Sequence, residues 1–208
     1  MSVRHALAPY ANGAARKGFR RLIANLPVRE DPAKVAFPLH ATARWARMKL
    51  PRAVFDGYLK FAITRNPYDR AVSYVEFLKQ TPHLRRHEQY RDATFTEALD
   101  MMAQRRRKET QADMVADRHG RLLIDRVLRL ETLDADFAAL RDELGLPPSV
   151  SLPRHNTTDR GRYLEYFEND AAARDKVAKL FADDFETFGY DLDPSKCAAV
   201  APPKFSLR

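Results

Sequence analysis

The stretch LKFAITRNPYDRAVSYV, residues 59–75, decides how this chain folds. Its first part, 59–64, is a short apolar run that includes phenylalanine and isoleucine, which is typical of a buried strand. Directly after it, Asn66 is a good helix N-cap, Pro67 suits the first helical position, and Asp69 favours the start of a helix. The sequence therefore predicts a strand that leads at once into a helix.

The junction between this strand and this helix has the features of an anion site. Ligands of open α/β sheets bind at the carboxyl ends of strands, and the free N–H groups and dipole of a helix start favour anions. Arg65 lies at the junction and offers a forked, permanently charged donor, while Ser73 follows Asn66 by two helical turns on the same face. The residues alone leave a second interpretation open, in which Arg65 is structural and pairs with Asp69.

Other segments around this junction predict further helices and one more strand. Helices are expected at 42–48, from a capping box at 94–97, over a stripe that stops at Gly145, and over a long amphipathic segment that ends at Gly189. The run 122–130 is typical of a second strand. Strands that alternate with helices predict an α/β fold with a mainly parallel sheet, although two strands are few for such a fold.

Length and composition indicate one globular domain. The chain has 208 residues, of which 45% are hydrophobic and 31% charged, and this excludes collagen-like and fully disordered proteins. We expect the domain to span 1–193 and residues 194–208, rich in proline and small side chains, to form a loose tail. The net charge of +8 favours an anionic partner.

Several classes of protein and site are excluded by what the sequence lacks. No apolar run approaches the length of a membrane span, and the N-terminus has no secretory h-region, so we expect a cytoplasmic protein. The single cysteine, Cys197, excludes an internal disulfide and a cysteine-built zinc site. His83 and His87 have metal-ligand spacing but no third ligand, so no metal is predicted. No nucleic-acid-binding motif is present.

Residues 61–74, FAITRNPYDRAVSY, resemble the 3′-phosphate-binding segment of the carbohydrate-type (family 2) sulfotransferases, related to heparan sulfate 2-O-sulfotransferase and its bacterial relatives. In that family a strand leads to Arg, Asn/Asp-Pro, an aromatic residue, Asp/Glu-Arg, and a Ser eight residues after the first Arg. Every element is present here. The resemblance implies a P-loop-NTPase-like sulfotransferase fold with helices flanking a mainly parallel central sheet. It also implies that Arg65 and Ser73 hold the 3′-phosphate of the donor 3′-phosphoadenosine-5′-phosphosulfate (PAPS).

Four further segments resemble the family in the expected order, namely 39–43, 111–133 (the family's strand pair), 153–157 and 177–190 (its closing helix). The first contains His40, which matches the family's histidine ahead of the 3′-phosphate strand. The resemblance implies that His40 is the general base that removes the acceptor's hydroxyl proton, a role suited to the pKa of histidine. From the residues alone, His40 is equally well a helix-capping or core histidine.

One family element is missing from this sequence. The family begins with a strand and a Lys-Thr-x-Gly-Thr-Ser loop that holds the 5′-phosphosulfate, and residues 13–18 have P-loop glycine spacing but lack the Lys-Ser/Thr that must follow. Residues 2–7 resemble the helix after that loop, so Ser2 matches the last residue of the loop. We therefore expect the first strand and loop to be encoded upstream of Met1, and the chain to transfer little sulfate without them.

The predicted function is the transfer of a sulfuryl group from PAPS to a hydroxyl group, on a carbohydrate as the resemblance implies. No metal is required. The alternative is a catalytically deficient module that binds a nucleotide or a polyanion. A P-loop nucleotide kinase is disfavoured because the sequence has neither a Walker motif nor a magnesium-binding carboxylate pattern.

Overall fold

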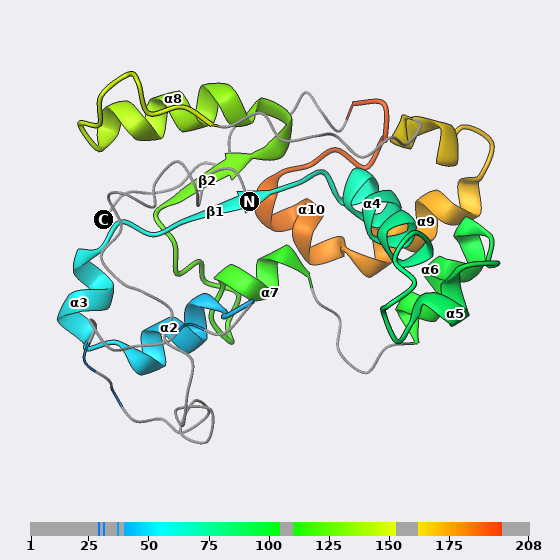
Figure 1. Cartoon of the computed structure of the whole chain (residues 1–208), viewed down its shortest axis with the longest axis horizontal. Coiled ribbons are helices and arrows are strands. Elements are labelled where there is room, and N and C mark those ends of the chain that lie inside the picture. The colour runs from blue at the N-terminus through cyan, green and yellow to red at the C-terminus, as the bar shows by residue number, and fades with distance from the viewer. Residues whose placement is uncertain are drawn as a thin grey trace. The chain divides into compact units, whose positions relative to one another are not determined.

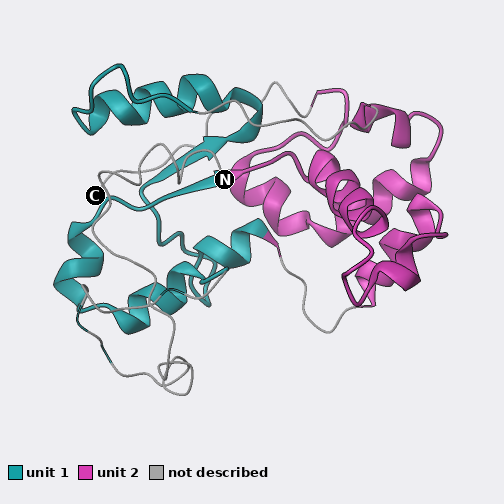
Figure 2. Cartoon of the chain, viewed as in Figure 1, with its two compact units in different colours: residues 1–63, 111–156, 205–208 teal, residues 64–110, 157–204 magenta. Residues whose placement is uncertain are grey.

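The computed structural model describes residues 29, 31, 37, 40–104, 110–152 and 162–196. These residues belong to two compact units, which Figure 2 shows in different colours. Unit 1 comprises Met1–Ile63, Gln111–Asn156 and Phe205–Arg208, and unit 2 comprises Thr64–Thr110 and Thr157–Lys204. Each unit is therefore assembled from segments that are distant in the sequence.

Unit 1 contains the small sheet and the helices that pack around it (Figure 1). Its elements are α2 (Ala43–Lys49), α3 (Arg52–Gly57), β1 (Phe61–Thr64, whose last residue is assigned to unit 2), α7 (Gln111–Val115), β2 (Arg126–Arg129), the 3₁₀ turn η3 (Leu130–Thr132) and α8 (Leu133–Glu143).

The two strands form a parallel pair, β1–β2. The backbone N–H groups of Asp125 and Arg126 both donate to the carbonyl oxygen of Lys60, at 2.7 and 3.1 Å. The starts of the two strands therefore lie side by side, which is the parallel arrangement. A parallel pair needs a long connection, and the chain supplies one by passing through the first segment of unit 2, Thr64–Thr110, between the two strands.

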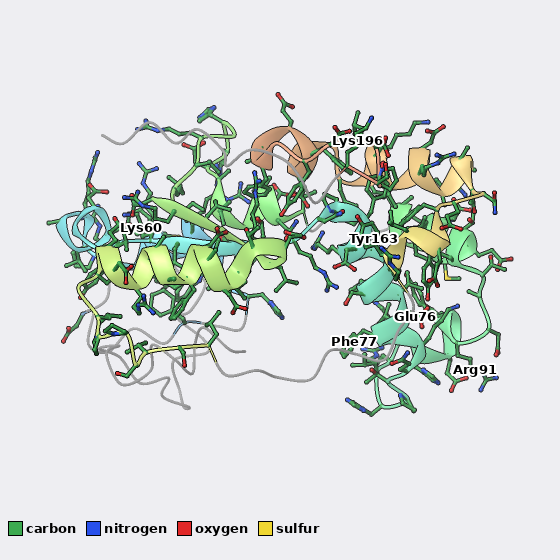
Figure 3. All side chains as sticks on the ribbon, turned by 90° about the horizontal axis from the view of Figure 1, so that it is seen from above. Lys60, Glu76, Phe77, Arg91, Tyr163 and Lys196 are labelled. Atoms are coloured by element: carbon green, nitrogen blue, oxygen red, sulfur yellow. The ribbon has the colours of Figure 1, made fainter. Side chains whose placement is uncertain are left out.

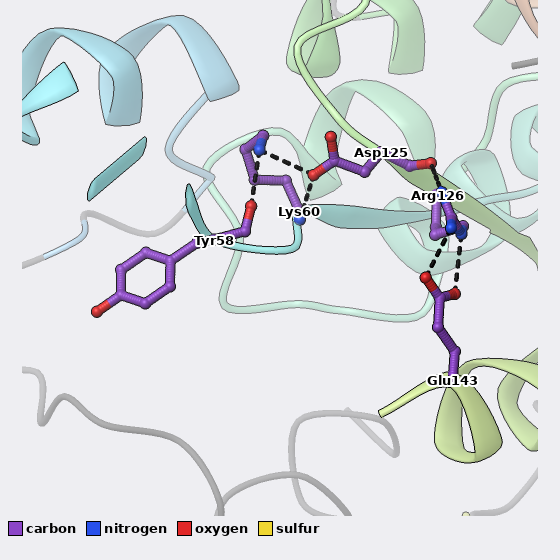
Figure 4. A network of polar contacts seen from close by, with 5 residues as sticks. All are labelled: Tyr58, Lys60, Asp125, Arg126 and Glu143. Atoms are coloured by element: carbon purple, nitrogen blue, oxygen red, sulfur yellow. Dashed lines mark hydrogen bonds and ion pairs between the residues drawn. The ribbon is translucent and has the colours of Figure 1, made fainter. Parts of the chain in front are cut away.

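Charged side chains hold the start of this sheet together (Figure 4). The Asp125 carboxylate accepts from the Lys60 backbone N–H at 2.7 Å and pairs with the Lys60 ammonium at 2.8 Å. The Arg126 guanidinium forms a two-pronged pair with Glu143, with N–O distances of 2.9 and 2.6 Å, and so joins β2 to the end of α8. Beneath these contacts, the apolar side chains of Leu128 and Phe137 pack β2 against α8.

Unit 2 is helical. Its elements are α4 (Pro67–Lys79), α5 (His87–Tyr90), α6 (Phe95–Ala103), the 3₁₀ turn η4 (Tyr163–Tyr166), α9 (Ala171–Leu180) and α10 (Ala182–Phe188). Helix α4 packs against α5, α6, α9 and η4, and α6 packs against α9. Across the pair α6–α9, the Lys176 ammonium contacts the Asp100 carboxylate at 2.7 Å, and the hydroxyl of Thr96 donates to Asp170 at 2.7 Å.

The fold class predicted from the sequence is confirmed, since helices accompany a small parallel sheet. The local ends of the elements are also confirmed. Asn66 caps α4, the capping box of Thr94 and Glu97 opens α6, and Gly189 ends α10 with a left-handed φ of 66°. Across the described ranges, no helix combines the length and the apolar character that a membrane crossing requires.

Three predicted elements differ from the structure. The second strand is only Arg126–Arg129, because Leu122 pairs with Ala116 in an isolated antiparallel bridge. The strand pair expected across 111–133 is wrong at its start, where α7 is helical. The single long C-terminal helix is wrong as well. It breaks at Phe181, whose ring is buried beneath the Arg70 guanidinium at 5.0 Å, and this leaves α9 and α10 as separate helices.

The capping box of α6 generates a test of the packing of unit 2. Thr94 Oγ accepts from the Glu97 N–H at 3.3 Å, and the Glu97 carboxylate accepts from the Thr94 N–H at 2.8 Å and from its hydroxyl at 2.7 Å. We expect Thr94→Ala to lower the free energy of unfolding by about 1 kcal/mol in urea titrations at neutral pH. The conservative Thr94→Ser variant keeps the hydroxyl and should lose far less, so equal losses would contradict the assignment.

Candidate functional site

The junction of β1 and α4 has the local geometry that its sequence predicts. The Asn66 side-chain oxygen accepts from the backbone N–H groups of Tyr68 at 2.8 Å and Asp69 at 3.4 Å, and Pro67 occupies the first helical position. The expectation of free first-turn N–H groups is therefore wrong. Pro67 has none, and those of Tyr68 and Asp69 already donate to the cap. An anion at this junction depends on side chains and on the helix dipole.

Asn66 also holds the junction to the C-terminal part of unit 2. Its side chain is 1% exposed, and its amide nitrogen donates to the Tyr163 hydroxyl at 3.0 Å. The Tyr163 hydroxyl donates in turn to the carbonyl oxygen of Pro194 at 2.7 Å (Tyr163 is labelled in Figure 3). Close by in the chain, the hydroxyls of Thr64 and Tyr190 share a hydrogen bond of 3.2 Å. The strand end, the helix start and the 190–194 segment are thus joined by buried and half-buried hydrogen bonds.

The turn around Pro194 is itself stabilised by a carboxylate. Asp193 accepts from the Ser195 hydroxyl at 2.6 Å and from the Ser195 N–H at 2.9 Å, and it pairs with Lys196 at 3.1 Å. These contacts lower the pKa of Asp193 from 3.8 to about 2. Because the pKa is lower in the folded state, this contribution to stability is complete above the ordinary pKa of aspartate and is lost as the pH falls towards 2.

Arg65 lies at this junction with a defined ionic partner. Its Nε contacts the Asp69 carboxylate at 2.5 Å, and the two side chains are 22% and 18% exposed. The pairing that the sequence left open is therefore present. It engages Nε and ties the Arg65 guanidinium to Asp69 in the first turn of α4.

Ser73 lies on α4 and is half-buried. It follows Asn66 by seven residues, so the helical repeat places it on the face of α4 that begins at the cap. Arg65, Asn66 and Ser73 are thus brought together in one strand–helix segment of unit 2. Arg70, the second arginine of the segment, is instead used structurally, since it lies over the Phe181 ring and 3.6 Å from the fully buried Asp184.

His40 belongs to unit 1 and has an unusual backbone. Its φ is 61°, in the left-handed region, which costs an L-residue about 1–2 kcal/mol. Two residues later Thr42 caps α2, its hydroxyl oxygen accepting from the Trp45 N–H at 3.1 Å. Strained positions of this kind cluster at functional sites, where the surrounding structure holds them in place.

The remaining candidates from the sequence are Ser2 and the histidine pair His83 and His87. Ser2 lies outside the described residues. The ring nitrogen Nδ1 of His87 is 3.0 Å from the carbonyl oxygen of Leu78, so this histidine has a structural contact in unit 2. Within the described ranges, no group of three or more histidine, cysteine, aspartate or glutamate side chains is arranged to hold a metal ion.

Tyr163 is the residue of this site that sequence reasoning missed. Its hydroxyl links the Asn66 amide to the carbonyl oxygen of Pro194. No local pattern signals this role, because Asn66 and Tyr163 are 97 residues apart in the sequence.

The sequence profile of the sulfotransferase family matches residues 29–191, which include His40, Arg65 and Ser73. The chain therefore belongs to the sulfotransferase family, and this membership supports sulfuryl transfer as its chemistry. No curated protein and no solved structure gives a significant match.

Asn66 provides a test of how the junction is held. Asn66→Ala removes the cap and leaves the half-buried Tyr163 without its donor, so we expect a loss of about 2–3 kcal/mol in the free energy of unfolding. Asn66→Ser keeps a cap oxygen and loses the amide donor without burying a charge, and should cost about 1–2 kcal/mol. Urea unfolding measures both. Parent stability in Asn66→Ser would show that the amide contact with Tyr163 contributes nothing, and equal losses in the two variants would show that the cap contributes nothing.

Proposed function

We propose that the sulfotransferase domain in this chain serves the transfer of a sulfuryl group from PAPS to a hydroxyl group of a carbohydrate. Membership of the sulfotransferase family, which generally uses PAPS as donor, supports the transfer chemistry. The observation that carries the donor assignment is the β1–α4 junction, where Arg65 and Ser73 flank the first two turns of a helix of 13 residues.

In this proposal the 3′-phosphate of PAPS binds to side chains at the junction. The Arg65 guanidinium supplies paired charged donors, and the Ser73 hydroxyl supplies a further one. The dipole of α4 adds a favourable field for the anion. Asn66 does not contact the phosphate, but its two sets of hydrogen bonds fix the helix start that carries both side chains. Ser2 is proposed to contact the 5′-phosphosulfate.

His40 acts in this proposal as the general base. The acceptor oxygen attacks sulfur while the bond between sulfur and the bridging phosphate oxygen breaks, so adenosine 3′,5′-bisphosphate leaves and a sulfate ester forms. The proton of the acceptor hydroxyl passes to the His40 imidazole, whose ordinary pKa makes it a competent base near neutral pH. The left-handed backbone of His40 supports a functional role for this position.

Nucleotide binding tests the roles of Arg65 and Ser73. We expect Arg65→Ala to weaken the binding of adenosine 3′,5′-bisphosphate by roughly 1.5–3 kcal/mol, because charged hydrogen bonds are lost. Ser73→Ala should cost about 1 kcal/mol. Isothermal titration calorimetry on the folded variants measures both.

The matched control for this test is Arg91→Ala. Arg91, labelled in Figure 3, is an exposed arginine of unit 2 whose guanidinium pairs with the nearby carboxylates of Glu88 and Asp92. Its removal changes the net charge equally and should leave the affinity unchanged. Equal affinity of the parent chain for adenosine 3′,5′-bisphosphate and adenosine 5′-phosphate would contradict the 3′-phosphate assignment.

Two substitutions at His40 separate chemistry from backbone strain. We expect His40→Ala and His40→Gly to lower turnover alike, by about 10²–10⁴-fold, because both remove the imidazole. Glycine accepts a positive φ, so His40→Gly should be about 1 kcal/mol more stable than His40→Ala. Release of adenosine 3′,5′-bisphosphate from PAPS in sulfate-transferring preparations reports turnover, and urea unfolding reports stability.

Nucleotide affinity should barely change in either His40 variant. A His40→Gly enzyme that keeps the parent turnover would show that His40 has only a backbone role. Parallel loss of nucleotide affinity and stability in both variants would make it a structural residue.

A further inference from the structure

The surface of unit 2 between α4 and α5 combines an exposed aromatic ring with exposed cations. The ring belongs to Phe77 of α4, which is labelled in Figure 3 and is 53% exposed. The cations are Arg85 and Arg86, which are exposed in the turn that leads into α5. We name these three residues the α4–α5 patch. None of them has a role in the proposed sulfuryl transfer.

Contacts within unit 2 fold the turn before α5 back along α4. The Arg86 guanidinium donates to the Tyr74 hydroxyl at 3.2 Å, and Tyr74 lies about one helical turn before Phe77. Leu84, from the turn, packs with Tyr74 on one apolar cluster. After Phe77, the Thr81 hydroxyl donates to the Phe77 carbonyl oxygen at 2.5 Å. The exposed arginines of the turn are therefore brought to the part of α4 that carries the exposed ring.

The charge around the α4–α5 patch is positive. Residues 76–86 carry three permanent cations against one carboxylate, that of Glu76. Neither Arg85 nor Arg86 forms an ion pair with any residue that the structure describes. The next carboxylates along the chain, in α5 and just after it, already pair with Arg91. The two arginines of the patch therefore face solvent with their charge unneutralised, which favours an external anion.

Phe77 differs from the other apolar residues of its helix. The core face of α4 includes Val72, Val75 and Leu78, which are all buried, whereas Phe77 lies outside that face. A single exposed apolar side chain is ordinary on a protein surface. What distinguishes Phe77 is its place beside two arginines without ionic partners, because this pairing of chemistries matches a surface that is anionic outside and apolar beneath.

We propose that the α4–α5 patch docks unit 2 on the surface of an anionic lipid membrane. The guanidinium groups of Arg85 and Arg86 bind the phosphate and carboxylate oxygens of the headgroups. The Phe77 ring enters the boundary between headgroups and acyl chains, where apolar side chains of surface-bound proteins lie. A dissolved polyanion offers partners for the arginines but leaves the ring without an apolar environment, so the membrane fits both features of the patch.

Docking of this kind is weak and reversible. A few arginines near an anionic surface each contribute about fivefold to the affinity, and one partly inserted ring adds about tenfold. Because the arginines are exposed, salt screens their attraction to the membrane. The proposal concerns binding at the membrane surface and needs no helix that crosses the bilayer.

Cosedimentation of the full chain with lipid vesicles tests the docking. The vesicles are pure phosphatidylcholine or a two-to-one mixture of phosphatidylcholine and phosphatidylserine. We expect the chain to sediment with the mixed vesicles and to stay in solution with pure phosphatidylcholine. Binding to the mixed vesicles should fall as sodium chloride is added. Absence of binding to the mixed vesicles at low salt would overturn the proposal.

Charge variants locate the binding. Arg85→Gln and Arg86→Gln should each weaken binding to the mixed vesicles about fivefold, because each removes one cation from the membrane surface. The control, Lys179→Gln, removes the same charge from α9 of the same unit, where Lys179 is exposed and lies outside the patch. It should leave the affinity unchanged. Equal losses in all three variants would show attraction by net charge alone and overturn the proposal.

Variants of Phe77 test whether the ring enters the bilayer. Phe77→Ala should weaken vesicle binding about tenfold, and its stability in urea should stay close to that of the parent because the ring is exposed. Phe77→Trp adds an indole to a chain whose only tryptophan is Trp45. In mixed vesicles whose phosphatidylcholine carries brominated acyl chains, tryptophan fluorescence should be quenched more in this variant than in the parent. Equal quenching in the two proteins would place the ring in water and contradict the proposal.

A DNA duplex serves as the competing polyanion. If the duplex displaces the chain from the mixed vesicles and its own binding depends on Arg85, Arg86 and Phe77 alike, the patch is a nucleic-acid surface and the membrane proposal is wrong. Binding of the duplex that is unchanged in these variants supports the proposal. Vesicle binding needs no nucleotide, so this inference stands or falls independently of the assignment of Arg65 to the 3′-phosphate.

Discussion

The buried amide of Asn66 is the constraint on which the proposed donor site depends. Its oxygen caps α4, and its nitrogen donates to Tyr163, which in turn contacts Pro194. One side chain therefore fixes both the direction in which the helix leaves the strand and the place where the C-terminal segment of unit 2 returns. Because the side chain is buried, each of these hydrogen bonds is costly to lose.

This arrangement changes how an anion is held at the helix start. The N–H groups of Tyr68 and Asp69 are already engaged by the cap, so the first turn does not act as a set of open backbone donors. In the proposed site the charge comes instead from Arg65, whose Nε contacts Asp69. The forked geometry of a guanidinium suits phosphate oxygens, and this agrees with the proposed binding of a 3′-phosphate.

The proposed catalytic functions are divided between the two units. Residues for the donor's 3′-phosphate lie in unit 2, whereas His40, the proposed base, lies in unit 1. Within unit 1, Thr42 lies two residues after His40 and caps α2, the helix that carries Arg44 and Trp45.

The sequence alone determined the features that depend on neighbouring residues. The Asn66 cap, the capping box at Thr94 and the left-handed end at Gly189 were all predicted, because each involves contacts within a few positions. Arg65 and Ser73 could be singled out for the same reason, since they share one strand–helix segment.

Tertiary structure decided what depends on distant partners. Phe181, where the predicted long helix breaks, packs beneath Arg70 of α4, a residue far away in the sequence. The role of Tyr163 arises in the same way, from residues that are far apart in the chain. Local propensity cannot anticipate such contacts, because their energy exists only once the elements have packed.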